Sequence, residues 1–362
     1  MDPLRSSRCL RLSYTLAAVG LCAGCTGSGS LGSGSFGAAD TEGEGEESEV
    51  TTGVVSSGEA SSTAQVDTSE TGEGRVLLDV GGGQPPDTAD PDAGIGCSKA
   101  DILFVVDDSP SMASSQSTLV GSIPGFVDTL RTDLDEISSL HVGVVSTGAF
   151  NVESPDPPEC DTLGALVTAP GGANSSNTDC GPFVSGGRYM TEDDDLTEAL
   201  SCALLLGTSG STWQRPIDSA RNAIAPALNA AGACNDGFIR DDALLVIVLI
   251  TDIDDFNISQ GMTNSGSMGG PVEWVQDVVD RKGREEHVAV VSVVPTVPPN
   301  ACDGLLDPKD PEFFSPADRI IAFTRAFTHG VVGDICEPDF SAVLGDAIDS
   351  IEAACMDFVP EG

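Results

Sequence analysis

Short apolar runs alternate along residues 97–358 with segments whose apolar residues recur every three to four positions. Runs rich in valine and isoleucine that end at turn-forming residues are typical of buried strands, and four occur, at 102–106, 142–146, 243–250 and 288–294. The three-to-four spacing predicts helices at 119–130, 195–206, 216–228, 272–279, 317–327 and 340–354, with a last strand near Val331. Pro124 lies inside the first of these helices and is expected to bend or break it.

The alternation of strands and helices predicts the fold class. Apolar strands separated by helices favour a Rossmann-like, doubly wound α/β domain, in which helices flank both faces of a mostly parallel central sheet. We expect this domain to span residues 97–358, which is long enough for a sizeable core, and to leave a tail at 359–362. Two stretches rich in glycine and polar residues, 151–187 and 257–270, are expected to be inserts on this framework, the second of them mobile.

The composition changes sharply before residue 97. Residues 26–96 are rich in glycine, serine, threonine and acids, and Arg75 is the only basic residue among them. Such a segment cannot bury enough apolar surface to offset its ordering entropy, so we expect a disordered acidic tether that its like charges extend. The formal net charge of the whole chain is −41. That charge excludes nucleic acids as partners, because binding them relies on clustered Lys and Arg.

The first 25 residues resemble a bacterial export signal with a lipid attachment point. Three arginines precede an apolar stretch at 12–21 that is too short to span a bilayer. Small residues then lead to Cys25 in Leu21-Cys-Ala-Gly-Cys25, a lipobox-like sequence in which Cys22 holds the place usual for leucine. We therefore expect residues 1–25 to be a signal peptide with a lipidated Cys25. This implies a lipid-anchored protein of the bacterial cell envelope, at the outer membrane or the cell surface, with plain secretion as the alternative.

Eight cysteines lie in the predicted domain. An even number of cysteines in an exported chain predicts disulfide bonds, here up to four. No two of them show Cys-x-x-Cys spacing, which argues against a thiolate metal site or a redox motif. Spacing does not determine the connectivity. Our hypothesis is that one bond closes the domain, one staples the first insert and two join later segments, as Cys97–Cys355, Cys160–Cys180, Cys202–Cys234 and Cys302–Cys336.

Asp107, Ser109 and Ser111 follow the first buried strand at alternate positions. A loop at the carboxyl end of such a strand lies at the edge where open α/β sheets bind ligands. One carboxylate and two hydroxyls supply oxygen ligands only, which hard divalent cations such as Mg²⁺ prefer, whereas Zn²⁺ prefers nitrogen and sulfur. The pattern therefore predicts a divalent-cation site, with Mg²⁺ the first choice and Ca²⁺ or Mn²⁺ the alternatives.

At these residues the chain resembles the von Willebrand factor type A (VWA) family. Asp107-x-Ser109-x-Ser111 is similar to that family's metal-ion-dependent adhesion site, and a methionine such as Met112 often follows there. The resemblance covers most of residues 97–358 and implies the doubly wound α/β fold described above. It also implies two further ligands, an Asp and a Thr, each from another loop.

The two further ligand positions match this chain unequally well. Leu249-Ile-Thr-Asp252 ends the strongest apolar strand as the family's Thr-Asp does, so the resemblance makes Asp252 the second carboxylate. The hydroxyl position stays open, because Thr208, Ser211 and Thr212 all precede the next predicted helix. A serine can coordinate as threonine does, since both offer a hydroxyl lone pair. We expect Ser211 or Thr212 to be the ligand.

Acidic residues crowd the same predicted edge. If the two strands adjoin, Asp107 and Asp108 meet Asp252, Asp254 and Asp255 there. Carboxylates a few ångströms apart repel one another, which raises their pKa values or destabilises the fold, and a divalent cation would relieve this. Asp254 and Asp255 have two interpretations, further groups around the cation or solvated acids of an acidic protein, and we favour the second.

The resemblance implies a protein-interaction module, not an enzyme. In the family, an open coordination position of the cation accepts an Asp or Glu carboxylate from a partner protein, and we expect such a partner here. We also expect the domain to be a monomer that contacts the membrane only through its lipid. The alternative is a metal-independent structural lipoprotein of the envelope.

A hydrolase or phosphotransferase is disfavoured. The three histidines are far apart, no Gly-x-x-x-x-Gly-Lys occurs, and Ser109 stands where haloacid-dehalogenase-like enzymes carry a second Asp.

Overall fold

The computed structural model describes residues 97–134, 136–148, 160–211, 213–255, 258–259, 262–263, 266–302 and 315–359. The predicted signal peptide at 1–25, the tether at 26–96 and most of the tail at 359–362 lie outside these residues, as does a smaller part of each predicted insert. No helix within the described ranges is long and apolar enough to cross a membrane.

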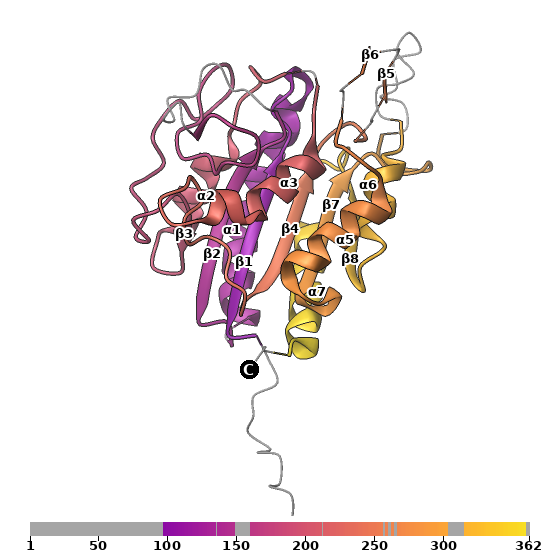
Figure 1. The fold of residues 1–362 in the computed structure, drawn as a ribbon. Helices are drawn as coiled ribbons and strands as arrows, with labels where there is room; N and C mark the ends of the chain where they lie inside the picture. Colours follow the sequence, from indigo (N-terminus) through magenta and orange to yellow (C-terminus); the bar gives the residue numbers. More distant parts are fainter. Residues whose placement is uncertain are drawn as a thin grey trace, which may run out of the picture. The chain divides into compact units, whose positions relative to one another are not determined.

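A six-stranded sheet forms the centre of the domain, in the order β3-β2-β1-β4-β7-β8 (Figure 1). Five strands are parallel, and their bounds are β1 Lys99–Val106, β2 Ser139–Ser146, β4 Leu244–Ile250, β7 Val288–Val294 and β8 His329–Asp334. The two-residue strand β3, Met190–Thr191, pairs antiparallel with β2. All seven residues of β4 are buried, as expected for a strand covered on both faces.

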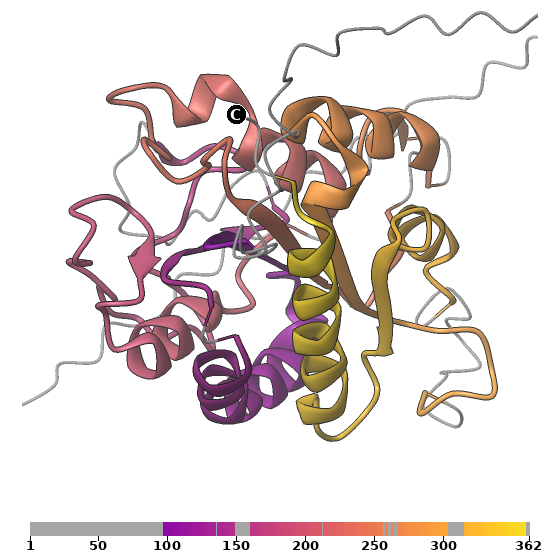
Figure 2. The same cartoon turned by 90° about the horizontal axis from the view of Figure 1, so that it is seen from below.

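Helices cover both faces of this sheet (Figure 2). Successive strand residues point to opposite faces, so Ile102 and Phe104 belong to one core cluster while Leu103 and Val105 belong to the other. The first cluster includes residues of α1 Ala113–Asp133, α2 Leu196–Leu204 and α7 Ser341–Asp357. The second includes residues of α3 Pro216–Ile224, α5 Pro271–Lys282 and α6 Asp318–Thr324. The predicted doubly wound α/β fold is therefore confirmed.

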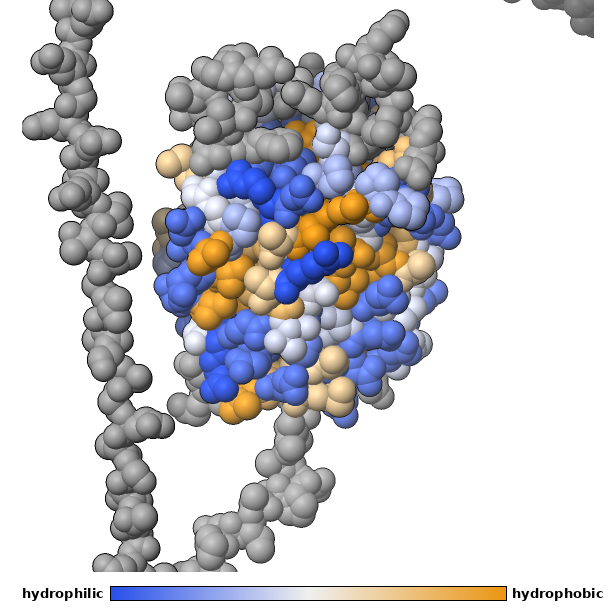
Figure 3. Space-filling view, turned by 90° about the vertical axis from the view of Figure 1, so that its right-hand side faces the viewer, coloured by the Kyte–Doolittle hydropathy of each residue, from blue (hydrophilic) through white to orange (hydrophobic). Residues whose placement is uncertain are grey.

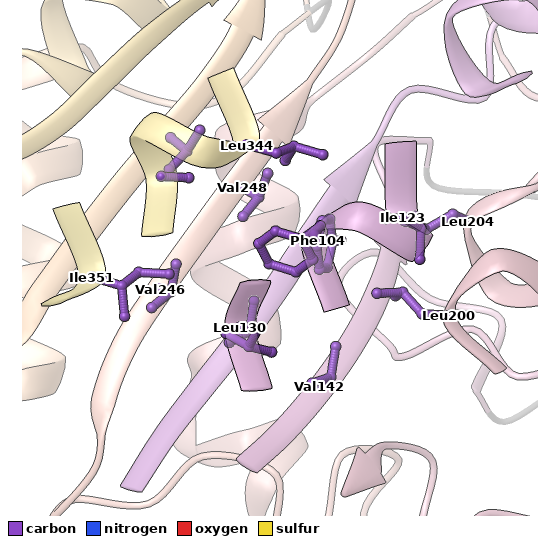
Figure 4. Packing of buried hydrophobic residues seen from close by; sticks show 14 of the residues in the cluster. Phe104, Ile123, Leu130, Val142, Leu200, Leu204, Val246, Val248, Leu344 and Ile351 are labelled. Carbon is purple, nitrogen blue, oxygen red and sulfur yellow. The ribbon is translucent and has the colours of Figure 1, made fainter. Parts of the chain in front are cut away.

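The packing of the first face shows why the predicted elements form where they do. Phe104 of β1 contacts Phe126 of α1 edge to face, with ring centroids 6.0 Å apart. Figure 4 shows side chains from β2, β4, α2 and α7 meeting around Phe104. The three-to-four spacing of the helices and the apolar runs of the strands thus supply the two sides of one interface.

Two of the predicted helices contain a proline, with different outcomes. α1 runs through Pro124 without a break. Pro124 is exposed, whereas Ile123 and Phe126 pack against the sheet, so water can serve the carbonyl that lacks its helical partner. The predicted helix at 216–228 is instead divided into α3 and α4, Pro226–Asn229, because Ala225 before the proline is extended.

Short elements complete the fold. They are the 3₁₀ turns η1 Pro110–Met112 and η3 Glu285–His287, and the hairpin strands β5 Ile258–Ser259 and β6 Met262–Thr263 within the second predicted insert. β8 is an edge strand, and its residues Val331 and Val332 are half-buried. Figure 3 shows this side of the molecule, where apolar residues gather in patches across the middle of the face and polar residues predominate above and below them.

Four disulfide bonds link the eight cysteines of the domain. Cys97–Cys355 joins the start of β1 to the last turn of α7, and Cys302–Cys336 joins the loops after β7 and β8, both as predicted. The other two predicted pairings are wrong, since the observed bonds are Cys160–Cys234 and Cys180–Cys202. The first insert is therefore stapled to α2 and to the segment after α4, and not to itself. Cys160 and Cys180 each lie against a different part of the domain, so they bond to Cys234 and Cys202 and not to each other.

Candidate metal centre

Asp107 lies at the carboxyl end of β1 and is fully buried. Its backbone N–H donates to Ile250 O at 2.9 Å, which extends the pairing between β1 and β4 by one residue. Its carboxylate accepts the Ser109 backbone N–H on Oδ1 at 2.7 Å and the Thr251 hydroxyl on Oδ2 at 2.6 Å. The carboxylate is thus held between its own loop and the end of β4.

Asp252 supplies the second carboxylate of the site. Its side chain is 2% exposed, and Oδ1 is buried without a hydrogen-bond partner. Burial raises the pKa of Asp252, against an opposing hydrogen bond from the Ser111 side chain. Burial and, to a smaller extent, the negative charge of Asp252 raise the pKa of Asp107 to about 7. Two buried carboxylates, the charge of one hindering ionisation of the other, are stabilised in their charged form by a cation.

Ser109 and Ser111 lie on the turn that follows β1. Their hydroxyl oxygens are 3.2 Å apart, because the 3₁₀ turn η1 begins directly after Ser109 and brings alternate side chains together. Met112 closes the turn with a hydrogen bond from its N–H to Ser109 O and is itself buried. Four of the predicted residues, Asp107, Ser109, Ser111 and Asp252, are therefore brought together. They offer oxygen atoms only and an orphan acceptor, which fits a hard divalent cation.

A second loop, residues 207–214, lies against this site. Gly210 N–H donates to Asp108 O at 3.0 Å, and a Cβ at Gly210 would stand 2.1 Å from the Asp108 carboxylate. Ser211 is half-buried on this loop, and its hydroxyl oxygen accepts the Trp213 N–H at 2.9 Å. The loop that was expected to supply the hydroxyl ligand thus contacts Asp108, the residue next to Asp107. Ser211 as a ligand stays a prediction, and Thr212 lies outside the described residues.

Gln116 is a site residue that the sequence analysis missed. Its amide nitrogen donates to Asp107 O at 2.8 Å and to Gly207 O at 2.9 Å, and its amide oxygen accepts the Gly207 N–H at 3.0 Å. This fully buried side chain joins α1 to both loops. One feature of the sequence could have indicated this role. Gln116 lies one turn before Leu119 on the apolar stripe of the helix, where a buried amide needs hydrogen-bond partners.

Asp108 does not face the same way as Asp107. Its Oδ2 accepts the Ser146 hydroxyl at 2.7 Å at the end of β2, and its Oδ1 is buried without a partner. Burial raises the pKa of Asp108 to about 6. Consecutive residues at a strand end project to opposite sides, which separates this carboxylate from Asp107.

Asp254 and Asp255 are not the solvated acids that we favoured. They are 4% and 0% exposed, respectively. Asp254 accepts the backbone N–H groups of Arg319 and Ile320, both at 3.1 Å, and Asp255 accepts that of Ile217 at 3.0 Å. Carboxylates are stabilised at helix N-termini by the unpaired N–H groups there. The two residues therefore anchor the N-terminal turns of α6 and α3.

Comparisons with known proteins found matches among solved structures alone. No family model and no curated protein matches the chain. Among solved structures, proximal thread matrix protein 1 from the mussel byssus with a zinc-occupied MIDAS motif is 14% identical, at a TM-score of 0.35 over 70% of this chain and 48% of that one. The pilus adhesin SpaC from Lactobacillus rhamnosus GG is 12% identical, at a TM-score of 0.38 over 71% and 30%.

A third structure, a von Willebrand factor type A protein from Catenulispora acidiphila, is 15% identical, at a TM-score of 0.32 over 71% of this chain and 42% of that one. The chain thus spans less than half the length of each of these three proteins. The domain has the doubly wound α/β fold that the VWA resemblance implied. The geometry of this chain's own residues is what supports a cation site.

Proposed function

We propose that this protein is an exported, lipid-anchored domain that binds a partner protein through a divalent cation. The observation that carries the proposal is the pair of buried carboxylates of Asp107 and Asp252, contributed by adjacent parallel strands, with an unpaired oxygen on Asp252. Burying such a pair without a cation is costly, because each charge is desolvated and repels the other. The two serine hydroxyls beside them complete an oxygen-only set of donors.

In this proposal Asp107, Asp252, Ser109 and Ser111 hold the ion, together with Ser211 or Thr212. Mg²⁺ is the preferred ion and Ca²⁺ or Mn²⁺ the alternatives. A bound ion supplies a coordination position for an Asp or Glu carboxylate of the partner and makes that contact strong and directional. The domain acts as a monomer and binder without enzymatic turnover.

The place of action follows from the N-terminal sequence. A lipid on Cys25 anchors the chain to the bacterial envelope, at the outer membrane or cell surface, and the acidic segment at 26–96 carries the domain away from it. The net charge of −41 keeps nucleic acids out of the partner class.

The second candidate is a metal-independent structural lipoprotein of the envelope. It is favoured by the four disulfide bonds, which tie both ends of the domain and its first insert to the sheet and helices. It is also favoured by the hydrogen bonds that Asp107 receives from Ser109 and Thr251.

One experiment separates the two candidates. Mg²⁺ is titrated by calorimetry into the purified, chelator-treated domain and its Asp107→Asn variant, and envelope proteins are then captured with and without chelator. The proposal expects Mg²⁺ binding by the wild type alone and capture that chelator abolishes. The structural alternative expects no Mg²⁺ binding and identical capture by both proteins.

A further inference from the structure

The segment that carries Asp252 ends in a buried carboxylate that reaches another element. Asp255 has no exposed surface, and its Oδ2 accepts the Ile217 N–H in the first turn of α3 at 3.0 Å. Arg215, the residue that precedes α3, provides no side-chain cap of its own. The first turn of α3 is therefore capped from a different part of the chain, three residues beyond Asp252.

Ser267 completes this cap. Its N–H donates to Asp255 Oδ1 at 2.5 Å, and its hydroxyl donates to Asp255 Oδ2 at 2.6 Å. The same hydroxyl oxygen accepts the Asp218 N–H at 2.7 Å. Asp255 and Ser267, both fully buried, thus take up two consecutive N–H groups of α3, which would otherwise be left without partners.

The loop that carries Ser211 runs directly into α3 through Arg215, the residue that precedes the helix. Arg215 N–H donates to Thr147 O at 2.9 Å, and Gly210 N–H donates to Asp108 O at 3.0 Å. Ser211 lies between these two fixed points. A chain held at both ends over so few residues has little freedom, so a shift of α3 moves Ser211 relative to the end of β1.

We propose that Asp255, together with Ser267, is a positioning residue that holds the loop carrying Ser211 in place for cation binding without touching the ion. This inference rests on the proposed function. It also explains why an acidic residue is buried there, since a carboxylate accepts hydrogen bonds from several donors at once.

Asp254 provides a matched control on the same segment. It is buried like Asp255 and also binds a helix N-terminus, but that helix is α6, which carries none of the candidate ligands. Loss of either carboxylate is expected to cost stability. Asp254 Oδ1 also accepts the Asp255 N–H at 2.9 Å, a bond that the amide oxygen of Asp254→Asn can keep. Only loss of the Asp255 carboxylate is therefore expected to act on the Ser211 loop.

The test compares wild type, Asp255→Asn, Ser267→Ala, Ser267→Thr and Asp254→Asn. Mg²⁺ affinity is measured by calorimetry, and hydrogen exchange of residues 207–215 by mass spectrometry on the metal-free proteins. Loss of a group that orients metal ligands typically costs about tenfold to a hundredfold in affinity. We expect such a loss, with faster exchange at 207–215, in Asp255→Asn and Ser267→Ala. Ser267→Thr is expected to keep wild-type affinity, and Asp254→Asn to melt earlier with its affinity unchanged.

Two outcomes would overturn the inference. One is unchanged exchange at 207–215 in both Asp255→Asn and Ser267→Ala, and the other is an equal loss of affinity in Asp254→Asn. If Asp255→Asn fails to fold, Ser267→Ala decides, because it keeps the carboxylate. A wild type that binds no Mg²⁺ would instead refute the proposed function, and the exchange data would still show whether Asp255 holds the loop.

Discussion

Thr251 donates its hydroxyl hydrogen to Asp107 Oδ2 at 2.6 Å, across the carboxyl ends of two adjacent parallel strands. Both residues are fully buried. The hydrogen bond orients the Asp107 carboxylate. Its donor, Thr251, is the residue directly before Asp252, which supplies the second carboxylate. The hydrogen bond therefore joins the two segments that carry the candidate carboxylate ligands.

Replacing Thr251 by valine tests this relationship. The substitution keeps the shape of the side chain but leaves Asp107 Oδ2 without its donor, so we expect the free energy of unfolding to fall by about 2 kcal/mol. Denaturant titration in the presence of chelator measures this change. A variant as stable as wild type would show that the hydroxyl adds nothing to the site.

Asp107 and Asp108 are neighbours with different roles, and paired variants separate them. Asp107→Asn is expected to abolish Mg²⁺ binding, because it removes a charge beside Asp252. Asp108→Asn, whose side chain meets Ser146 at the end of β2, is expected to bind Mg²⁺ with an affinity close to that of wild type. Calorimetric titration gives both affinities. Equal losses in the two variants would contradict this division.

Stability without metal should fall as the pH rises, and Mg²⁺ should make that fall smaller. Burial raises the pKa of Asp107 to about 7 and that of Asp108 to about 6, from an ordinary value near 3.8. Raised carboxyl pKa values contribute stability that is present below the ordinary value and lost as the pH rises through the folded one. Without metal, the melting temperature should therefore fall from about pH 4 to about pH 8.

Millimolar Mg²⁺ should reduce this fall, because the ion binds the ionised form. Melting curves at several pH values, with chelator and with Mg²⁺, provide the measurement. Asp107→Asn in chelator serves as the control and should show a shallower decline. A flat profile for the chelated wild type would count against the buried carboxylates as the cause.

Gln116 should matter for stability although it lies outside the motif. Gln116→Leu removes the partners of the Gly207 N–H and of the Asp107 and Gly207 carbonyls, which are buried with it. We expect a loss of about 2 to 4 kcal/mol in the free energy of unfolding. Ser117→Ala, an exposed neighbour on the same helix, should change it by less than about 0.5 kcal/mol. Thermal and denaturant unfolding of both variants checks the contrast.

The disulfide connectivity is open to direct measurement. A non-reduced digest should yield one peptide pair joined through Cys160 and Cys234 and another joined through Cys180 and Cys202. Mass spectrometry before and after reduction identifies both pairs. A linked pair containing Cys160 and Cys180 would restore the connectivity expected from the order of cysteines along the chain.

The elements with their own local signal were predictable. The apolar run at 288–294 became β7 with the same bounds, and the Asp107 motif lies at the end of β1 as expected. In these cases the sequence pattern follows directly from burial. A strand buried on both faces is apolar throughout, and polar residues begin where the strand ends. The two-residue β3 had no such signal, since pairing with β2 alone defines it.

What the local pattern left open depended on segments far apart in the chain. Asp254 and Asp255 looked like further acids of an acidic protein, and only the approach of α6 and α3 made them buried caps. Cys160 and Cys180 lie close in sequence, yet each meets a cysteine from another part of the domain. A residue's type limits the bonds it can make, but its partner is decided by which surfaces the packed sheet and helices bring within reach, and no spacing along one chain encodes that distance.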